Sequence, residues 1–204
     1  ARCRLLVRFD FQRSIDEKLV DRTSGSLRTL SVALPGGMCV PATYLAACRQ
    51  IADDFVLAGE MERPAADRRL TEITERMTTL ANEIHHKMDV AGMRDAPALA
   101  SGHQAAFCQW LGLQTVATFS GGDTAGTGEI DQAVKSGQSA GVNIIVANEP
   151  EGRRLADALA DRLHARVVFF ANFPEPDKET AFDNLVRRNL AALLETGPSA
   201  EKKP

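Results

Sequence analysis

The stretch ALASGHQAAFCQWLGLQTVATF, residues 98–119, contains the pattern that decides the fold. Its apolar runs predict strands over 98–101 and 115–119, and the spacing between them predicts a helix over 103–112. Parallel strands need a crossover of about a dozen residues or more, usually a helix. The stretch therefore predicts one strand–helix–strand unit, with Ser101, Gly102 and His103 at the end of its first strand.

The same alternation continues along the chain. Further strands are predicted over 143–148 and 166–171, where uninterrupted apolar residues are typical of strands buried on both faces. Further helices are predicted over 129–140, 151–164 and 178–195. Four strands alternating with four helices predict a parallel α/β layer with helices on both faces.

The first part of the chain predicts a thinner layer. Strands are expected over 4–9 and 28–34, with a helix over 41–57. A long helix is expected over 64–90, because apolar residues recur there at helical spacing: Leu70, Ile73, Met77, Leu80, Ile84 and Met88. We therefore expect an α/β fold of two parallel-sheet lobes joined by a long spine helix.

The expected organisation is a truncated first lobe (1–63), the spine helix (64–90), a complete second lobe (91–196) and a disordered tail (197–204). Two strands leave sheet edges unpaired unless more chain, a second copy of the protein or another partner completes the first lobe.

The composition excludes several classes of protein. The 204 residues carry a net charge of −3, which argues against a nucleic-acid partner. No apolar run approaches the roughly 18–20 residues that cross a bilayer. The four cysteines form no CxxC pair, which argues against a zinc ribbon. The chain begins with Ala1 rather than Met, as expected of a processed form without its signal peptide, or of a fragment.

Candidate site residues follow from the predicted sheet, because ligands bind at the carboxyl ends of parallel strands. These ends carry His103, residues 120–123, Glu149 and Asn172. His103 and Glu149 are the two with metal-binding or acid–base chemistry. The alternatives are that His103 is satisfied by a backbone carbonyl at a helix start, and that Glu149 faces the dipole of the next helix.

Other motifs give weaker indications of function. The glycine-rich stretch 120–129 matches neither phosphate-binding pattern, which favours a loop at the mouth of a cleft. The adjacent histidines at 85–86 diverge on a helix, so we expect surface residues. No GxSxG or HExxH motif is present, and we expect that the protein is not an enzyme.

The ordered set of segments resembles a known family. ALASGHQAAFCQWLGLQTVATF, GEIDQAVKSGQSAGVNIIVANEP, GRRLADALADRLHARVVFFANFP and TAFDNLVRRNLAALLE are similar to the carboxyl-terminal lobe of the metal-binding solute-binding proteins of bacterial ABC importers. The predicted helix 64–90 resembles their interlobe spine. The opening RCRLLVRFDFQRSIDEKLV resembles the late part of their amino-terminal lobe.

The resemblance implies a zinc, manganese or iron ion bound in an interlobe cleft, delivered to an ABC permease and ATPase outside the cytoplasm. His103 matches one of the implied ligands. Gly36 stands where a histidine is implied, and Asn172 stands where an aspartate is implied. Glu149, Met38 and Cys39 are nearby substitutes.

The expected function is therefore a periplasmic or extracytoplasmic solute-binding protein, or a shortened relative. It would bind a divalent metal ion, zinc or manganese, through His103 and Glu149. The alternative is a binding or interaction module that keeps the fold and binds no metal.

Overall fold

The computed structural model describes residues 5–20, 27–34, 36–37, 39–120, 127–175 and 180–195. The expected tail 197–204, Met38 and residues 121–126 of the glycine-rich stretch lie outside the described residues. The chain divides into two compact units, which are described separately: residues 1–36 and 41–79 form unit 1, and residues 37–40 and 80–204 form unit 2.

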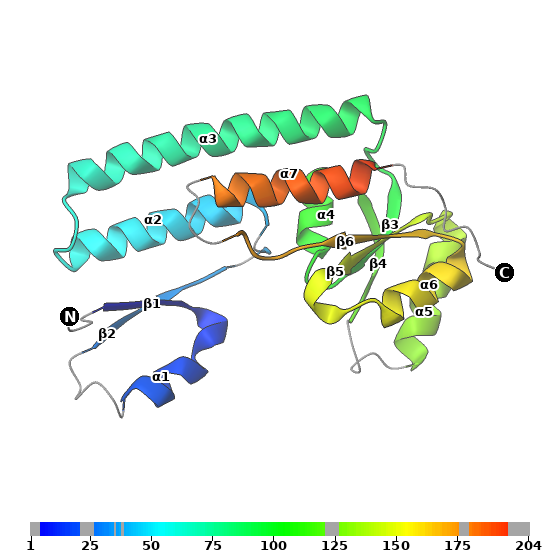
Figure 1. The fold of residues 1–204 in the computed structure, drawn as a ribbon, viewed down its shortest axis with the longest axis horizontal. Coiled ribbons are helices and arrows are strands. Elements are labelled where there is room, and N and C mark those ends of the chain that lie inside the picture. Colours follow the sequence, from blue (N-terminus) through cyan, green and yellow to red (C-terminus); the bar gives the residue numbers. More distant parts are fainter. Residues whose placement is uncertain are drawn as a thin grey trace. The chain divides into compact units, whose positions relative to one another are not determined.

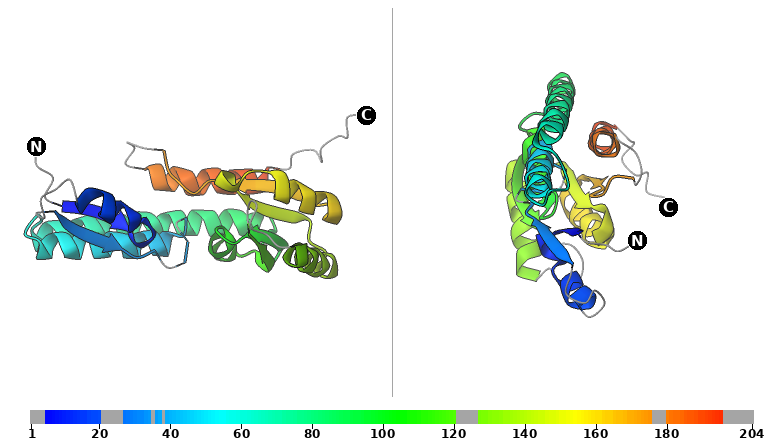
Figure 2. Two further views of the ribbon diagram at one scale, coloured as in Figure 1. Left: turned by 90° about the horizontal axis from the view of Figure 1, so that it is seen from below. Right: turned by 90° about the vertical axis from the view of Figure 1, so that its left-hand side faces the viewer.

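Unit 1 holds a two-stranded parallel sheet of β1 (Leu5–Phe9) and β2 (Arg28–Val32). Between these strands lie the short helix η1 (Asp10–Gln12) and α1 (Ser14–Val20), which the sequence analysis did not predict. The helix α2 (Pro41–Leu57) packs on β2 and runs beside the first half of α3 (Arg63–Val90) (Figures 1 and 2).

Polar side chains complete the hydrogen bonding of this small sheet. Gln50 on α2 donates from Nε2 to the Ser31 carbonyl at 2.7 Å, and its Oε1 accepts from the Ala33 N–H at 3.2 Å. A residue of a neighbouring parallel strand pairs in the same way. The buried Arg8 also pairs with Asp16 at 2.5 Å, which holds α1 against β1.

Unit 2 contains the four-stranded parallel sheet that the sequence predicted, in the order β4–β3–β5–β6. Its strands are β3 (Pro97–Ser101), β4 (Gln114–Phe119), β5 (Ile144–Asn148) and β6 (Arg166–Phe170). Its helices are α4 (Ala105–Leu111), α5 (Thr127–Ala140), η3 (Glu149–Glu151), α6 (Arg154–Leu163) and α7 (Ala181–Leu194). Every residue of β5 is buried, as its continuous apolar run predicts.

The helices cover both faces of this sheet (Figure 1). Helices α5 and α6 contact each other and share a core with Leu99, Ile145 and Leu159. Helices α4 and α7 lie on the other face, where Phe107 of α4 meets Phe170 of β6 with ring centroids 5.4 Å apart. β4 lies on one side of β3 and β5 lies on the other, so the connections after β3 and after β4 run in opposite directions across the sheet. Because both crossovers are right-handed, α4 and α5 lie on opposite faces.

Among the helices of the described residues, none combines the length and the apolar character that a membrane span requires.

Candidate functional site

The carboxyl edge of the unit 2 sheet brings together side chains that the sequence listed separately. Ser101 ends β3, Asn148 ends β5, and Asn172 follows β6. All three are buried, with at most 8% of their surface exposed. The parallel topology therefore gathers polar groups at one edge, as expected of the ligand-binding edge of such sheets.

A buried amide side chain ties this edge together from inside. Gln104, fully buried at the start of α4, places its Nε2 3.1 Å from Asn148 Oδ1 and 2.5 Å from Asn172 Oδ1. Its own Oε1 is buried without a hydrogen-bond partner among the described residues. Asn172, at the position where the resemblance implies an aspartate ligand, thus accepts a hydrogen bond from within the unit.

His103 stands on the turn between β3 and α4, and its imidazole faces a carboxylate. Its Nδ1 lies 3.1 Å from Glu151 Oε1, with 69% of the histidine side chain and 18% of the glutamate side chain exposed. Glu151 also accepts a hydrogen bond from Ser101 Oγ at 2.8 Å and one from Asn148 Nδ2 at 3.0 Å. Three donors converge on this one carboxylate.

This arrangement fixes the tautomer of a neutral His103. An ionised carboxylate only accepts hydrogen bonds, so the ring proton must lie on Nδ1. The Nε2 lone pair is then left open on a largely exposed ring. A carboxylate that holds one ring nitrogen while the other faces a ligand is the usual support of a metal-binding histidine.

Glu149 was expected at this edge together with His103, and the carboxylate that the structure places beside the imidazole is Glu151. Residues 149–151 form the 3₁₀ turn η3, in which successive side chains diverge by about 120°. Glu149 begins this turn and is exposed, whereas Glu151 points back to Ser101 and His103. The stretch EPE contains both carboxylates, and only the turn selects between them.

Glu149 instead lines a separate hollow of about 200 Å³ at the end of β6. The other lining residues are Phe169, Ala171, Arg188, Asn189 and Ala192. The Arg153 guanidinium lies over the Phe169 ring, 4.8 Å from its centroid. Arg188, with 52% of its side chain exposed, is 3.7 Å from Glu175. The hollow thus offers an aromatic ring and charges of both signs.

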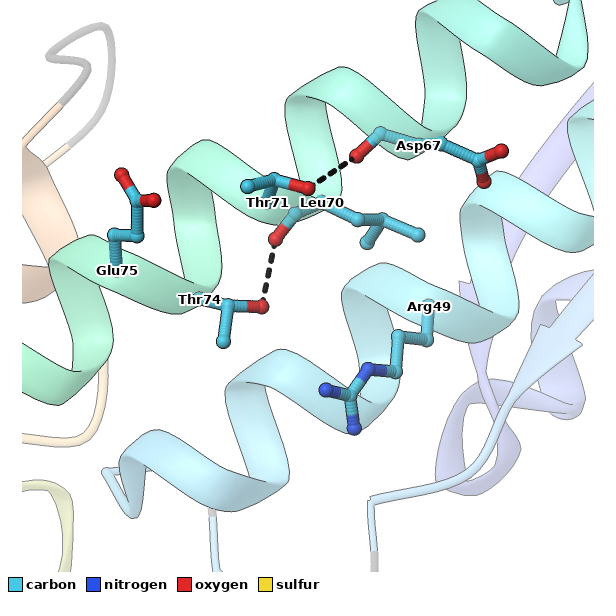
Figure 3. Close-up of a pocket in the computed structure, with 6 residues that line it drawn as sticks. All are labelled: Arg49, Asp67, Leu70, Thr71, Thr74 and Glu75. Carbon is cyan, nitrogen blue, oxygen red and sulfur yellow. Dashed lines mark hydrogen bonds between the residues drawn. The ribbon is translucent and has the colours of Figure 1, made fainter.

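Unit 1 has a larger hollow, of about 360 Å³, between α2 and α3 (Figure 3). Figure 3 shows that the charged side chains of Arg49, Asp67 and Glu75 point in different directions. The Thr71 and Thr74 hydroxyls donate to backbone carbonyls of their own helix. No set of polar groups converges on this hollow among the residues drawn, so it is a weaker candidate.

The two buried thiols are not open ligands. Cys39 and Cys108 are buried, and burial raises the pKa of each thiol to about 12. Cys39, named above as a substitute ligand, has its Sγ 3.4 Å from the Ala171 carbonyl. Cys48 is half-buried and is likewise free of disulfides.

The two adjacent histidines of α3 differ, although both were expected at the surface. His86 is exposed, whereas His85 is half-buried, with its Nε2 3.0 Å from the Trp110 carbonyl. In the part of the chain that the structure describes, no group of three or more His, Cys, Asp or Glu residues is arranged to hold a metal ion.

Comparisons with known proteins bear on the fold. No protein-family model and no curated protein sequence matches the chain significantly. Many solved structures are similar to the chain, and three of those that cover 94% of it illustrate the likeness. They are a Mn-bound periplasmic metal-binding protein from Candidatus Liberibacter asiaticus (TM-score 0.73, 10% identity, 79% of its length), ZnuA (0.68, 14%, 78%) and the laminin-binding protein Lbp of Streptococcus pyogenes (0.71, 14%, 81%).

These identities are low, so the likeness is one of fold. The chain has the α/β fold of periplasmic metal-binding proteins, as the resemblance drawn from its sequence predicted.

Proposed function

We propose that the chain is an extracytoplasmic solute-binding protein that binds a divalent metal ion, zinc or manganese, as cargo for an ABC importer. The cleft implied by the resemblance would present the ion to His103. The partners would be the permease and the ATPase of that importer, and the protein would not be an enzyme.

The observation that carries this proposal is the pairing of His103 with Glu151. The carboxylate, held by Ser101 and Asn148, orients the imidazole so that Nε2 faces outward. We assign Nε2 the role of direct ligand and Glu151 the role of orienting group. Glu149, exposed on the same turn, is the second candidate ligand.

Metal-dependent stability tests the proposal. At a free metal concentration of about 100 times Kd, binding stabilises the folded state by about 2.7 kcal/mol, or about 5–10 °C in Tm for a chain of this size. We expect ZnCl2 or MnCl2 to raise Tm in the wild type and in His86→Ala, the control at an exposed histidine. His103→Ala should lose the shift, and an unchanged shift in that variant would contradict the assignment.

A metal-free binding module remains the second candidate, because one observation favours it. Asn172 is buried and accepts a short hydrogen bond from Gln104, so the position of the implied aspartate is committed to the interior. Metal analysis of protein purified without chelators separates the two candidates. A stoichiometric ion supports metal binding, whereas none at excess added metal supports the module.

A further inference from the structure

The side chains of the proposed metal-binding edge supply fewer ligands than a divalent ion needs. The oxygens of Glu151, Asn148 and Asn172 already accept hydrogen bonds within unit 2. His103 Nε2 and the Glu149 carboxylate are the two exposed groups described above that could act as metal ligands. They fill two positions, whereas zinc takes about four ligands and manganese favours about six.

The hollow next to this edge has groups that a bare cation does not use. Arg188 contributes a half-exposed guanidinium, and the Glu175 carboxylate lies 3.7 Å from it. Guanidinium groups recognise carboxylates through paired hydrogen bonds. Phe169, whose ring lies under the Arg153 guanidinium, adds an apolar wall. These groups suit an organic anion.

The turn η3 links the hollow to the histidine. Its first residue, Glu149, lines the hollow, and its last residue, Glu151, holds the His103 ring. The hollow measures about 200 Å³, below the roughly 300–1,000 Å³ of sites that enclose a whole drug-sized ligand. It therefore suits part of a small organic acid.

We propose that the cargo is a metal chelate, a divalent ion carried by a small polycarboxylate. His103 Nε2 replaces one water on the ion, and a carboxylate of the chelator pairs with Arg188 in the hollow. The ion thus brings with it the ligands that this edge does not supply. This inference rests on the proposed function, and it names the chemical class of the cargo.

Isothermal titration with three zinc species tests the proposal: ZnCl2, zinc nitrilotriacetate, which keeps open positions, and zinc EDTA, which keeps almost none. We expect zinc nitrilotriacetate to bind at least about tenfold more tightly than ZnCl2, and zinc EDTA not to bind. His103→Ala should weaken zinc nitrilotriacetate by about tenfold or more. Arg188→Ala should weaken it several-fold and leave ZnCl2 unchanged.

Controls and outcomes separate the two claims. His86→Ala and Arg162→Ala change an exposed histidine and an arginine paired with Asp131, and both should bind like the wild type. Tight ZnCl2 binding that needs His103 but not Arg188 would overturn the chelate and keep metal binding. If neither ZnCl2 nor zinc nitrilotriacetate binds in a His103-dependent manner, the proposed function fails as well.

Discussion

Asn189 on α7 carries the clearest single-residue prediction for the fold. Its buried side chain donates from Nδ2 to the Ala171 carbonyl at 2.9 Å and accepts the Ala171 N–H at 3.0 Å. β6 is an edge strand, and its Arg166 N–H points to the Asn143 carbonyl beside β5. Backbone groups alternate along a strand, so those of Ala171 point to the open side. Asn189 thus replaces a missing neighbouring strand.

Asn189→Leu keeps the size of the side chain and removes both hydrogen bonds. Ala171 is only 8% exposed, so its N–H is left buried and unpaired, at about 1–3 kcal/mol. Its C=O loses the amide donor and keeps only the weaker Cys39 thiol, at about 1 kcal/mol. The added apolar burial returns about 1 kcal/mol. The expected loss in the free energy of unfolding is therefore about 1–3 kcal/mol.

Urea unfolding followed by fluorescence measures this loss, because Trp110 is the sole tryptophan and lies in unit 2. Asn184→Ala is the matched control, since Asn184 is exposed on the same helix and should change stability by less than about 0.5 kcal/mol. If Asn189→Leu costs no more than this control, the edge-pairing argument is wrong.

Three further predictions concern charge and protonation. Hydrogen bonds lower the pKa of Glu83 from 4.5 to about 2, and the largest contribution comes from Arg187 of α7. Glu83→Gln should therefore cost about 1–2 kcal/mol at neutral pH, and the difference from wild type should shrink as pH falls from about 4.5 towards 2. Cys39 and Cys108, with thiol pKa values of about 12, should react with Ellman's reagent at pH 8 only after unfolding. Nitrogen NMR should find neutral His103 as the Nδ1–H tautomer, and Glu151→Gln should shift it towards Nε2–H.

Each of these has a control and a contrary result. Glu72→Gln, at an exposed position of the same helix as Glu83, should show no such pH dependence. Rapid labelling of both buried thiols in the native protein would refute their burial. A wild-type spectrum dominated by the Nε2–H tautomer would remove the argument for an open ligand atom on His103.

Much of the second unit follows from the sequence alone. The uninterrupted apolar runs 144–146 and 167–170 predict buried parallel strands, because only strands covered on both faces need such runs. Gly112 caps α4 in the left-handed conformation, with φ of 89°, so that α4 ends one residue before the end of the predicted helix. The first unit is less legible, since α1 has only seven residues and little periodicity to detect.

The sequence by itself determined the order of strands and helices in the second unit, and hence that His103 stands at the carboxyl edge of a parallel sheet. These properties depend on local periodicity, which a sequence records directly. Only the tertiary structure decided that Glu151 rather than Glu149 meets His103, that Gln104 commits Asn172 to the interior, and that Asn189 closes the edge of β6. Those pairings join residues up to 68 positions apart, and they depend on side-chain directions set by turns and packing.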